Sequence, residues 1–234
     1  MRDREHAGKR VTDDAERTVL VSRLLGAVDA PCLTVGLMLQ DLAMVNVAAS
    51  YVSYEDFLEA EQKCDTKHEW LDGVVYAMGG GTIEHSRLAS RANTVLQLAF
   101  PNCTVFQSDA MLFVRATQLS TYADVVVVCG PVETQKVERN GRLLGEALIN
   151  PTVIVEVLSD STEQHDRCEK FAHYTRIPSL KEYVLLSQHA PKIEVFRRPE
   201  HGRWLHEEAS AGGTITIAGR EICVDDIYRR AAPG

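Results

Sequence analysis

Glu156 lies inside the run Pro-Thr-Val-Ile-Val-Glu-Val-Leu at residues 151–158. Apolar and β-branched residues dominate this run, as they do in a strand that is buried on both faces of a sheet. A carboxylate buried there loses its hydration shell, which costs several kcal/mol unless a cation or hydrogen-bond donors replace the water. The fold must therefore place a compensating group beside Glu156.

A second run, Tyr122–Val128, has the same character and carries Asp124 near its start. If the two strands are neighbours, the carboxylates of Asp124 and Glu156 can reach one point, because alternate side chains of a strand share a face. Sites rich in hard oxygen ligands suit Mg²⁺ or Mn²⁺. Taken alone, Asp124 could equally begin its strand as a capping residue.

The segment after Glu156 predicts a helix that begins at the capping-box pattern of residues 161–164 and runs to about Thr175. Asp166, Lys170 and Tyr174 are spaced by four and so line one face of that helix. Two carboxylates, a metal ion and a lysine suit phosphodiester hydrolysis, because the metal polarises the phosphoryl oxygen and the ammonium stabilises or orients it. Lys170 could instead be a solvated residue paired with Asp166.

Composition sets limits on function. The chain has 234 residues, 45% of them hydrophobic, which is enough for one good-sized core. Its net charge of −8 argues against a protein that simply coats nucleic acid. The acidity does not exclude an enzyme acting on nucleic acid, because a bound metal reverses the local sign of charge.

The sequence also bears on the cellular location of the protein and on the state of its cysteines. The longest apolar stretches are too interrupted to span a membrane, and the charged first residues do not resemble a signal peptide. The six cysteines are scattered without a Cys-x-x-Cys pair, so we expect reduced thiols and a cytoplasmic protein. A zinc site using His165, Cys168 and His173 would lack the usual four ligands in paired spacing.

The chain divides into an N-terminal extension at 1–49, a folded domain at 50–230 and a tail at 231–234. Helices are expected from Ser53 to about Lys63, from Glu84 to Phe100 and at 224–230. A hairpin is expected from Trp70 to Met78, turning at Asp72-Gly73. Further strands are expected near 103–107, 110–115, 122–129, 182–186 and 192–196, with short antiparallel strands over 203–223 and a loop over 130–149. This order predicts an α/β fold with a mixed sheet flanked by helices.

These residues together resemble the Uma2 family, within the PD-(D/E)XK restriction-endonuclease-like superfamily. The resemblance covers about residues 51–230. It is carried by Lys67-His68-Glu69-Trp70-Leu71-Asp72-Gly73, Glu84-His85-Ser86, Tyr122-Ala123-Asp124-Val125, the Glu156 strand, and the segment from Ser161 to Leu180 that includes Asp166, Lys170 and Tyr174.

The resemblance implies a metal-dependent DNA endonuclease with a restriction-endonuclease-like mixed sheet. Asp124 and Glu156 would be metal ligands, Lys170 the catalytic lysine, and Glu69 an additional acidic residue near the metal. His85 would lie at the mouth of the site, and Tyr174 is a further accessory candidate.

Two positions depart from the expected patterns. The superfamily lysine normally lies two residues after the acidic residue, where this chain has Leu158, so the resemblance implies that Lys170 has taken over its role. The family usually has Pro-Asp where this chain has Ala123-Asp124, which leaves the carboxylate in place.

Other functions remain open at this stage. A non-catalytic scaffold that keeps the fold and binds nucleic acid or a protein partner is the main alternative, since fold alone does not establish activity. A cysteine hydrolase using Cys168 lacks a supporting motif. Cutting both strands of a duplex commonly uses two symmetric sites, so a homodimer is the default expectation.

Overall fold

The computed structural model describes residues 51–160, 162–201 and 203–230. The predicted extension at 1–49 and tail at 231–234 lie outside the described residues. No helix in the described ranges is long and apolar enough to cross a membrane.

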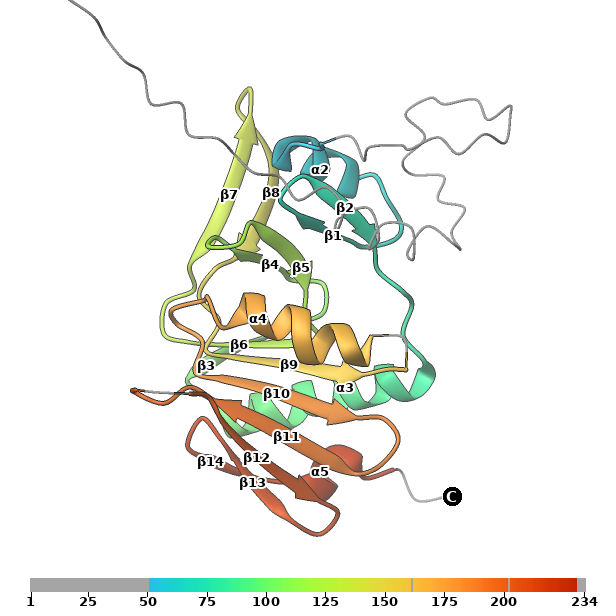
Figure 1. The fold of residues 1–234 in the computed structure, drawn as a ribbon, viewed down its shortest axis with the longest axis vertical. Coiled ribbons are helices and arrows are strands. Elements are labelled where there is room, and N and C mark those ends of the chain that lie inside the picture. The colour runs from blue at the N-terminus through green and yellow to red at the C-terminus, as the bar shows by residue number, and fades with distance from the viewer. Residues whose placement is uncertain (1–50, 161, 202, 231–234) are drawn as a thin grey trace, which may run out of the picture. The chain divides into compact units, whose positions relative to one another are not determined.

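The described part of the chain forms an α/β fold (Figure 1). The helices are α2 (Tyr54–Glu61), α3 (Ile83–Ala99), the π-helix η2 (His165–Lys170), α4 (Phe171–Tyr174) and α5 (Val224–Tyr228). The strands are β1 (His68–Leu71), β2 (Val74–Ala77), β3 (Cys103–Gln107), β4 (Met111–Val114), β5 (Leu119–Tyr122), β6 (Val125–Cys129), β7 (Thr134–Arg139), β8 (Arg142–Leu148), β9 (Val153–Leu158), β10 (Glu182–Ser187), β11 (Lys192–Arg197), β12 (Leu205–Ser210), β13 (Thr214–Ile217) and β14 (Arg220–Cys223).

The sheet that carries Glu156 has the strand order β12-β11-β10-β9-β6-β3. It is mixed, because β9 pairs parallel with β10 and antiparallel with β6. Helices cover both of its faces, with α3 and α5 on one side and η2 and α4 on the other (Figure 1). All six residues of β9 are buried, as expected for a central strand between two layers of helices.

A second sheet has the order β2-β1-β5-β4-β8-β7 and packs against α2 through an aromatic cluster of Tyr54, Phe57, Trp70 and Phe113. The two sheets meet at the peptide that joins β5 to β6. Tyr122 ends a strand of one sheet and Val125 begins a strand of the other. Asp124 therefore lies on the short linker between the sheets.

Most predicted elements are confirmed. Ser53 caps α2, its hydroxyl accepting a hydrogen bond from the Asp56 amide, and α3 ends just before Pro101. The hairpin of β1 and β2 turns at Asp72-Gly73, where both residues have positive φ. The strands at 182–187 and 192–197 and the short strands at 205–223 are also present.

Two predictions about strands are wrong. Residues 130–149 were expected to be a loop, but they form the antiparallel hairpin of β7 and β8, which turns at Asn140-Gly141. Asn-Gly is a strong hairpin signal, because both of its residues readily adopt the positive φ that a tight turn requires. The single strand expected at 122–129 is split between two sheets at Ala123-Asp124.

The expectation of reduced thiols is also wrong for one pair. Cys103 and Cys129 form a disulfide that links the edge strand β3 to β6. The two residues are direct partners in the antiparallel register, with their Cα atoms 4.3 Å apart. Although the residues are 26 apart in sequence, strand pairing brings them together, so their spacing along the chain carried no signal.

This disulfide predicts a measurable contribution to stability. Replacing both Cys103 and Cys129 by serine should lower the free energy of unfolding by about 3 kcal/mol, because the cross-link restricts the unfolded chain. Urea unfolding under non-reducing conditions measures the change, with the exposed free thiol Cys168→Ser as control. Equal stability of wild type and the double variant would contradict the assignment.

Candidate active site

Asp124 and Glu156 lie side by side because β6 and β9 are neighbours. Val125 pairs with Val155 in the antiparallel register, which places Asp124 beside Glu156. The Asp124 amide donates a hydrogen bond to Glu156 Oε2 at 3.4 Å, and the Val157 amide donates to Asp124 Oδ2 at 2.7 Å. The condition set by the sequence argument, that the two strands are neighbours, is met, and backbone amides donate hydrogen bonds to both carboxylates.

His85 reaches Asp124 from the first turn of α3. Its Nε2 lies 3.1 Å from Asp124 Oδ2. Thr82 caps this helix by accepting a hydrogen bond from the His85 amide. Gly81 makes room for the ring, since a Cβ at that position would lie 2.8 Å from His85 Nδ1. The hydrogen bond to Asp124 raises the pKa of His85 above its usual value, outweighing the opposing effect of burial.

Lys170 is buried among three carboxylates. Its Nζ lies 3.2 Å from Glu156 Oε1, 3.3 Å from Asp166 Oδ1 and 3.6 Å from Glu69 Oε1. Burial lowers the pKa of Lys170, but the charges of Glu156, Glu69 and Asp166 outweigh it and hold the pKa well above its usual value. The side chain is therefore an ammonium that compensates the buried negative charge.

Glu69 approaches the cluster from β1 of the second sheet. It accepts hydrogen bonds from Thr121 on β5 and from His165 Nε2, the latter at 3.3 Å. Burial alone would raise the pKa of Glu69. The hydrogen bond from His165, the charge of Lys170 and the hydrogen bond from Thr121 outweigh burial and lower the pKa to about 2.

Glu156 accepts hydrogen bonds at both of its carboxylate oxygens. Its Oε1 accepts hydrogen bonds from Lys170 Nζ and from the Tyr174 hydroxyl, the latter at 2.9 Å. Burial raises the pKa of Glu156 to about 8, although the charge of Lys170 opposes the rise. A further positive charge beside this carboxylate would favour its ionised form.

The helix after β9 differs from the prediction in its geometry. Its first part, η2, is a π-helix, and only residues 171–174 continue as α-helix. Asp166, Lys170 and Tyr174 are all buried, so the predicted shared face is confirmed. Single turns of π-helix often occur at functional sites. The Tyr183 hydroxyl donates to the Asp166 carbonyl at 3.0 Å and so ties this turn to β10.

The structure thus brings all six predicted site residues into one connected cluster: Asp124, Glu156, Lys170, Glu69, His85 and Tyr174. Leu158 packs in the core, so a lysine at that position would have to be buried among apolar side chains. Sequence reasoning considered His165 only for a zinc site and gave Thr121 no role. Both contact Glu69 from elements distant in sequence, and only the pairing of β1 with β5 and the packing of η2 reveal them.

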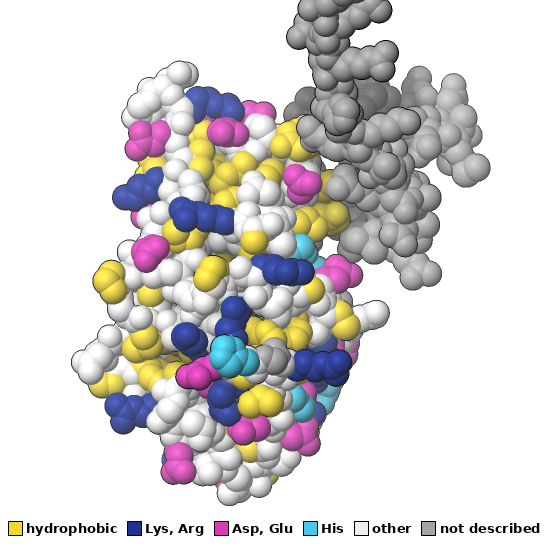
Figure 2. Space-filling view, turned by 60° about the vertical axis from the view of Figure 1, so that its left-hand side comes forward, with side chains coloured by type: hydrophobic (Ala, Val, Ile, Leu, Met, Phe, Trp, Pro, Cys, Tyr) yellow, Lys and Arg dark blue, Asp and Glu magenta, His cyan; other side chains and the backbone are white. Residues whose placement is uncertain are grey.

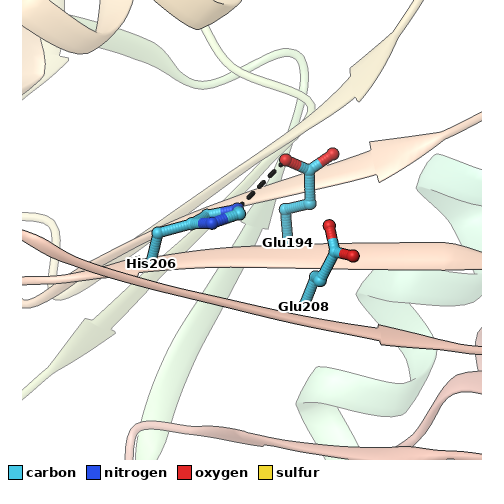
Figure 3. Close-up of side chains that lie close together, drawn as sticks. All are labelled: Glu194, His206 and Glu208. Carbon is cyan, nitrogen blue, oxygen red and sulfur yellow. Dashed lines mark hydrogen bonds and ion pairs between the residues drawn. The ribbon is translucent and has the colours of Figure 1, made fainter.

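A second group of possible metal ligands lies on β11 and β12. Among the described residues, Glu194, His206 and Glu208 are the one set of three whose ligand atoms lie within 4.8 Å of one another (Figure 3). Arg167 donates two hydrogen bonds to Glu194, and Lys192 Nζ lies 2.8 Å from the same carboxylate. These cations already offset the charge of Glu194, which disfavours a divalent ion there.

One face of the described residues carries both basic and acidic side chains. On the face drawn in Figure 2, Lys and Arg side chains of the described residues lie among Asp, Glu and apolar side chains rather than in one continuous basic band. Any contact between this face and a polyanion would therefore depend on individual basic side chains and not on an extended basic surface.

The fold is restriction-endonuclease-like, with mixed sheets flanked by helices. A cluster of carboxylates around one lysine lies where the two sheets meet. The chain belongs to the Uma2 family, whose model, described as "Putative restriction endonuclease", matches residues 54–222. This membership supports a nuclease-like function.

Two uncharacterized proteins of Synechocystis sp., slr1290 and sll1609, are similar to the chain. The first is 34% identical over 77% of this chain and 93% of its own length, and the second is 29% identical over 70% and 91%. The crystal structure of "a putative nuclease belonging to DUF820" from Anabaena variabilis shares the fold. Its TM-score is 0.56 at 16% identity, covering 73% of this chain and 96% of that one.

The lowered pKa of Glu69 predicts a pH dependence of stability. Because its folded pKa of about 2 lies below the ordinary value of 4.5, Glu69 stabilises the fold above pH 4.5. That contribution is lost as the pH falls from about 4.5 toward about 2. Between pH 7 and pH 3 the wild type should therefore lose about 2 kcal/mol more stability than Glu69→Gln.

Urea unfolding of both proteins at the two pH values measures the difference. The exposed residue Glu221 on β14 supplies the control variant Glu221→Gln, which should follow the wild type. Identical pH dependence in wild type and Glu69→Gln would show that Glu69 is not held ionised by its partners.

Proposed function

We propose that this protein is a Mg²⁺- or Mn²⁺-dependent endonuclease that hydrolyses phosphodiester bonds of DNA. The observation that carries the proposal is the buried contact of Lys170 with Glu156, one strand away from Asp124. A buried ammonium beside paired carboxylates is costly to maintain for stability alone, because apolar residues of similar volume often serve as well. The Uma2 family membership supports the same function.

The donor set fits a hard divalent ion. Asp124 and Glu156 would hold it, since carboxylate oxygens are the ligands that Mg²⁺ and Mn²⁺ prefer. Glu156 Oε1 is engaged by Lys170 and Tyr174, and Asp124 Oδ2 by the Val157 amide and His85. These contacts orient the two carboxylates that would hold the ion.

The chemistry divides between the ion and the side chains. A bound ion would polarise a phosphoryl oxygen and lower the pKa of a coordinated water. Lys170 holds a fixed positive charge where negative charge develops on the phosphate. In hydrolysis, water adds its oxygen to phosphorus and one P–O ester bond breaks, leaving a phosphate monoester and a hydroxyl group. His85, which is half-buried and contacts Asp124, would contact the phosphate or the water.

The main alternative is a non-catalytic scaffold that keeps the fold. One observation supports this alternative. Among the described residues, the ligand atoms around Asp124 and Glu156 do not form a set of three within 4.8 Å of one another. The acidic net charge of −8 adds to it. Binding of Mn²⁺ without turnover of any nucleic acid would favour this alternative.

Plasmid nicking tests the proposal. In the presence of Mg²⁺ or Mn²⁺ the wild type should cut supercoiled plasmid, and Glu156→Gln or Asp124→Asn should reduce the rate at least about 100-fold, because each removes a carboxylate from the assigned ion. Glu208→Gln is the matched control, since Glu208 belongs to the other acidic group and is exposed. Undiminished cleavage by Glu156→Gln, or loss of cleavage in the control alone, would contradict the assignment.

A two-fold dimer remains a prediction from the need to cut two strands. Light scattering on the full chain gives its mass directly, and a monomer that cuts both strands of a plasmid would remove the reason for expecting a dimer.

A further inference from the structure

Asp166 is a buried carboxylate to which the proposed reaction assigns no role. Only 3% of the residue is exposed, and it lies in the first part of η2, four residues before Lys170. Its Oδ1 receives no hydrogen bond of good geometry from the described residues, yet it lies 3.3 Å from Lys170 Nζ. An ionised group buried this deeply is destabilising unless a nearby charge compensates it.

Two contacts fix the position of Asp166 relative to Lys170. Its backbone carbonyl accepts a hydrogen bond from the Tyr183 hydroxyl, which fixes this turn of η2 against β10. Lys170 is the cation in direct contact with Asp166, and the charge of Asp166 also raises the pKa of His85 from a longer distance.

Lys170 is held from three directions. Glu156 and Asp166 lie at nearly equal distances of 3.2 and 3.3 Å, and Glu69 is somewhat farther at 3.6 Å. Under the proposed function, an ion on Glu156 competes with Lys170 for the charge of that carboxylate. The ammonium would then lose its attraction to Glu156 at the moment when the reaction needs it in place.

We propose that Asp166 is a positioning residue, which retains the Lys170 ammonium beside the reacting phosphate once a divalent ion occupies Glu156. The inference rests on the proposed function and adds a residue to it. Asp166 acts through Lys170 and does not itself bind the ion. Because it comes from the same turn of helix as Lys170, its hold on the ammonium does not depend on how β9 and β6 adjust to the ion.

A double-mutant cycle tests the proposal by kinetics. Asp166→Asn keeps the shape of the side chain and removes its charge. It should lower kcat by roughly 10- to 100-fold, the effect expected when a catalytic group is displaced by about 1 Å. KM and the affinity for Mn²⁺ should remain within about twofold of wild type, because neither the substrate nor the ion contacts Asp166.

The combined variant distinguishes an indirect from a direct role. If Asp166 acts through Lys170, the double variant Asp166→Asn/Lys170→Met should be no slower than Lys170→Met alone. Effects that multiply would overturn the proposal, as would a loss of Mn²⁺ affinity equal to that of Asp124→Asn, which would make Asp166 a ligand. Glu221→Gln, which removes one exposed negative charge on β14, should retain wild-type kcat. Equal kcat in Asp166→Asn and Glu221→Gln would also overturn the proposal.

A second measurement is independent of catalysis. In full-length protein labelled with ¹⁵N-lysine and loaded with Mg²⁺, the Lys170 ammonium should give a resonance protected from solvent exchange in wild type and exposed in Asp166→Asn. Protection that survives in Asp166→Asn would overturn the positioning role even if the protein cut no nucleic acid. Absence of plasmid cleavage by the wild type, with the ammonium result as expected, would count against the proposed function alone. Circular dichroism of each variant confirms that it is folded.

Discussion

The buried charge of Lys170 is the interaction on which the site depends. One ammonium lies within 3.6 Å of carboxylate oxygens from a central strand, from its own helix and from the other sheet. Each of these groups would be unfavourable alone in the core, and together they compensate one another. The acidic side chains here outnumber the single ammonium, and a divalent cation beside Glu156 would favour its ionised form.

The two sheets are joined at the position of the Lys170 cluster. The short linker Ala123-Asp124 passes from β5 to β6, so the residue that carries one carboxylate also marks the boundary between the sheets. Glu69 and Thr121 reach the cluster from the second sheet, and His165 links Glu69 to η2. The cluster is therefore assembled from elements that the fold brings together at one junction, and it contributes to holding that junction.

Much of the candidate site and several local turns could be predicted from the sequence, because the residues involved give local physical signals. A single carboxylate in an otherwise apolar strand identified Glu156, and spacing by four identified the shared face of Asp166, Lys170 and Tyr174. Ser53 and the Asp72-Gly73 turn gave clear local signals, and both are confirmed.

The failures also have physical causes. The Asn140-Gly141 turn is a local hairpin signal, but the charged residues around it within 130–149 are equally typical of a loop. The split of 122–129 between two sheets, the Cys103–Cys129 disulfide and the contacts of His165 depend on long-range pairing that no local pattern encodes. The π-helical turn of η2 was likewise invisible, because its residues fit an ordinary helix equally well.

The location of a bound ion tests the central claim most directly. A crystal structure of the full chain soaked with Mn²⁺, with the ion located by its anomalous scattering, should show a peak between Asp124 and Glu156 with the Lys170 ammonium still beside Asp166. A peak at Glu194, His206 and Glu208 instead, or an unoccupied Asp124 and Glu156 pair at saturating Mn²⁺, would contradict the account.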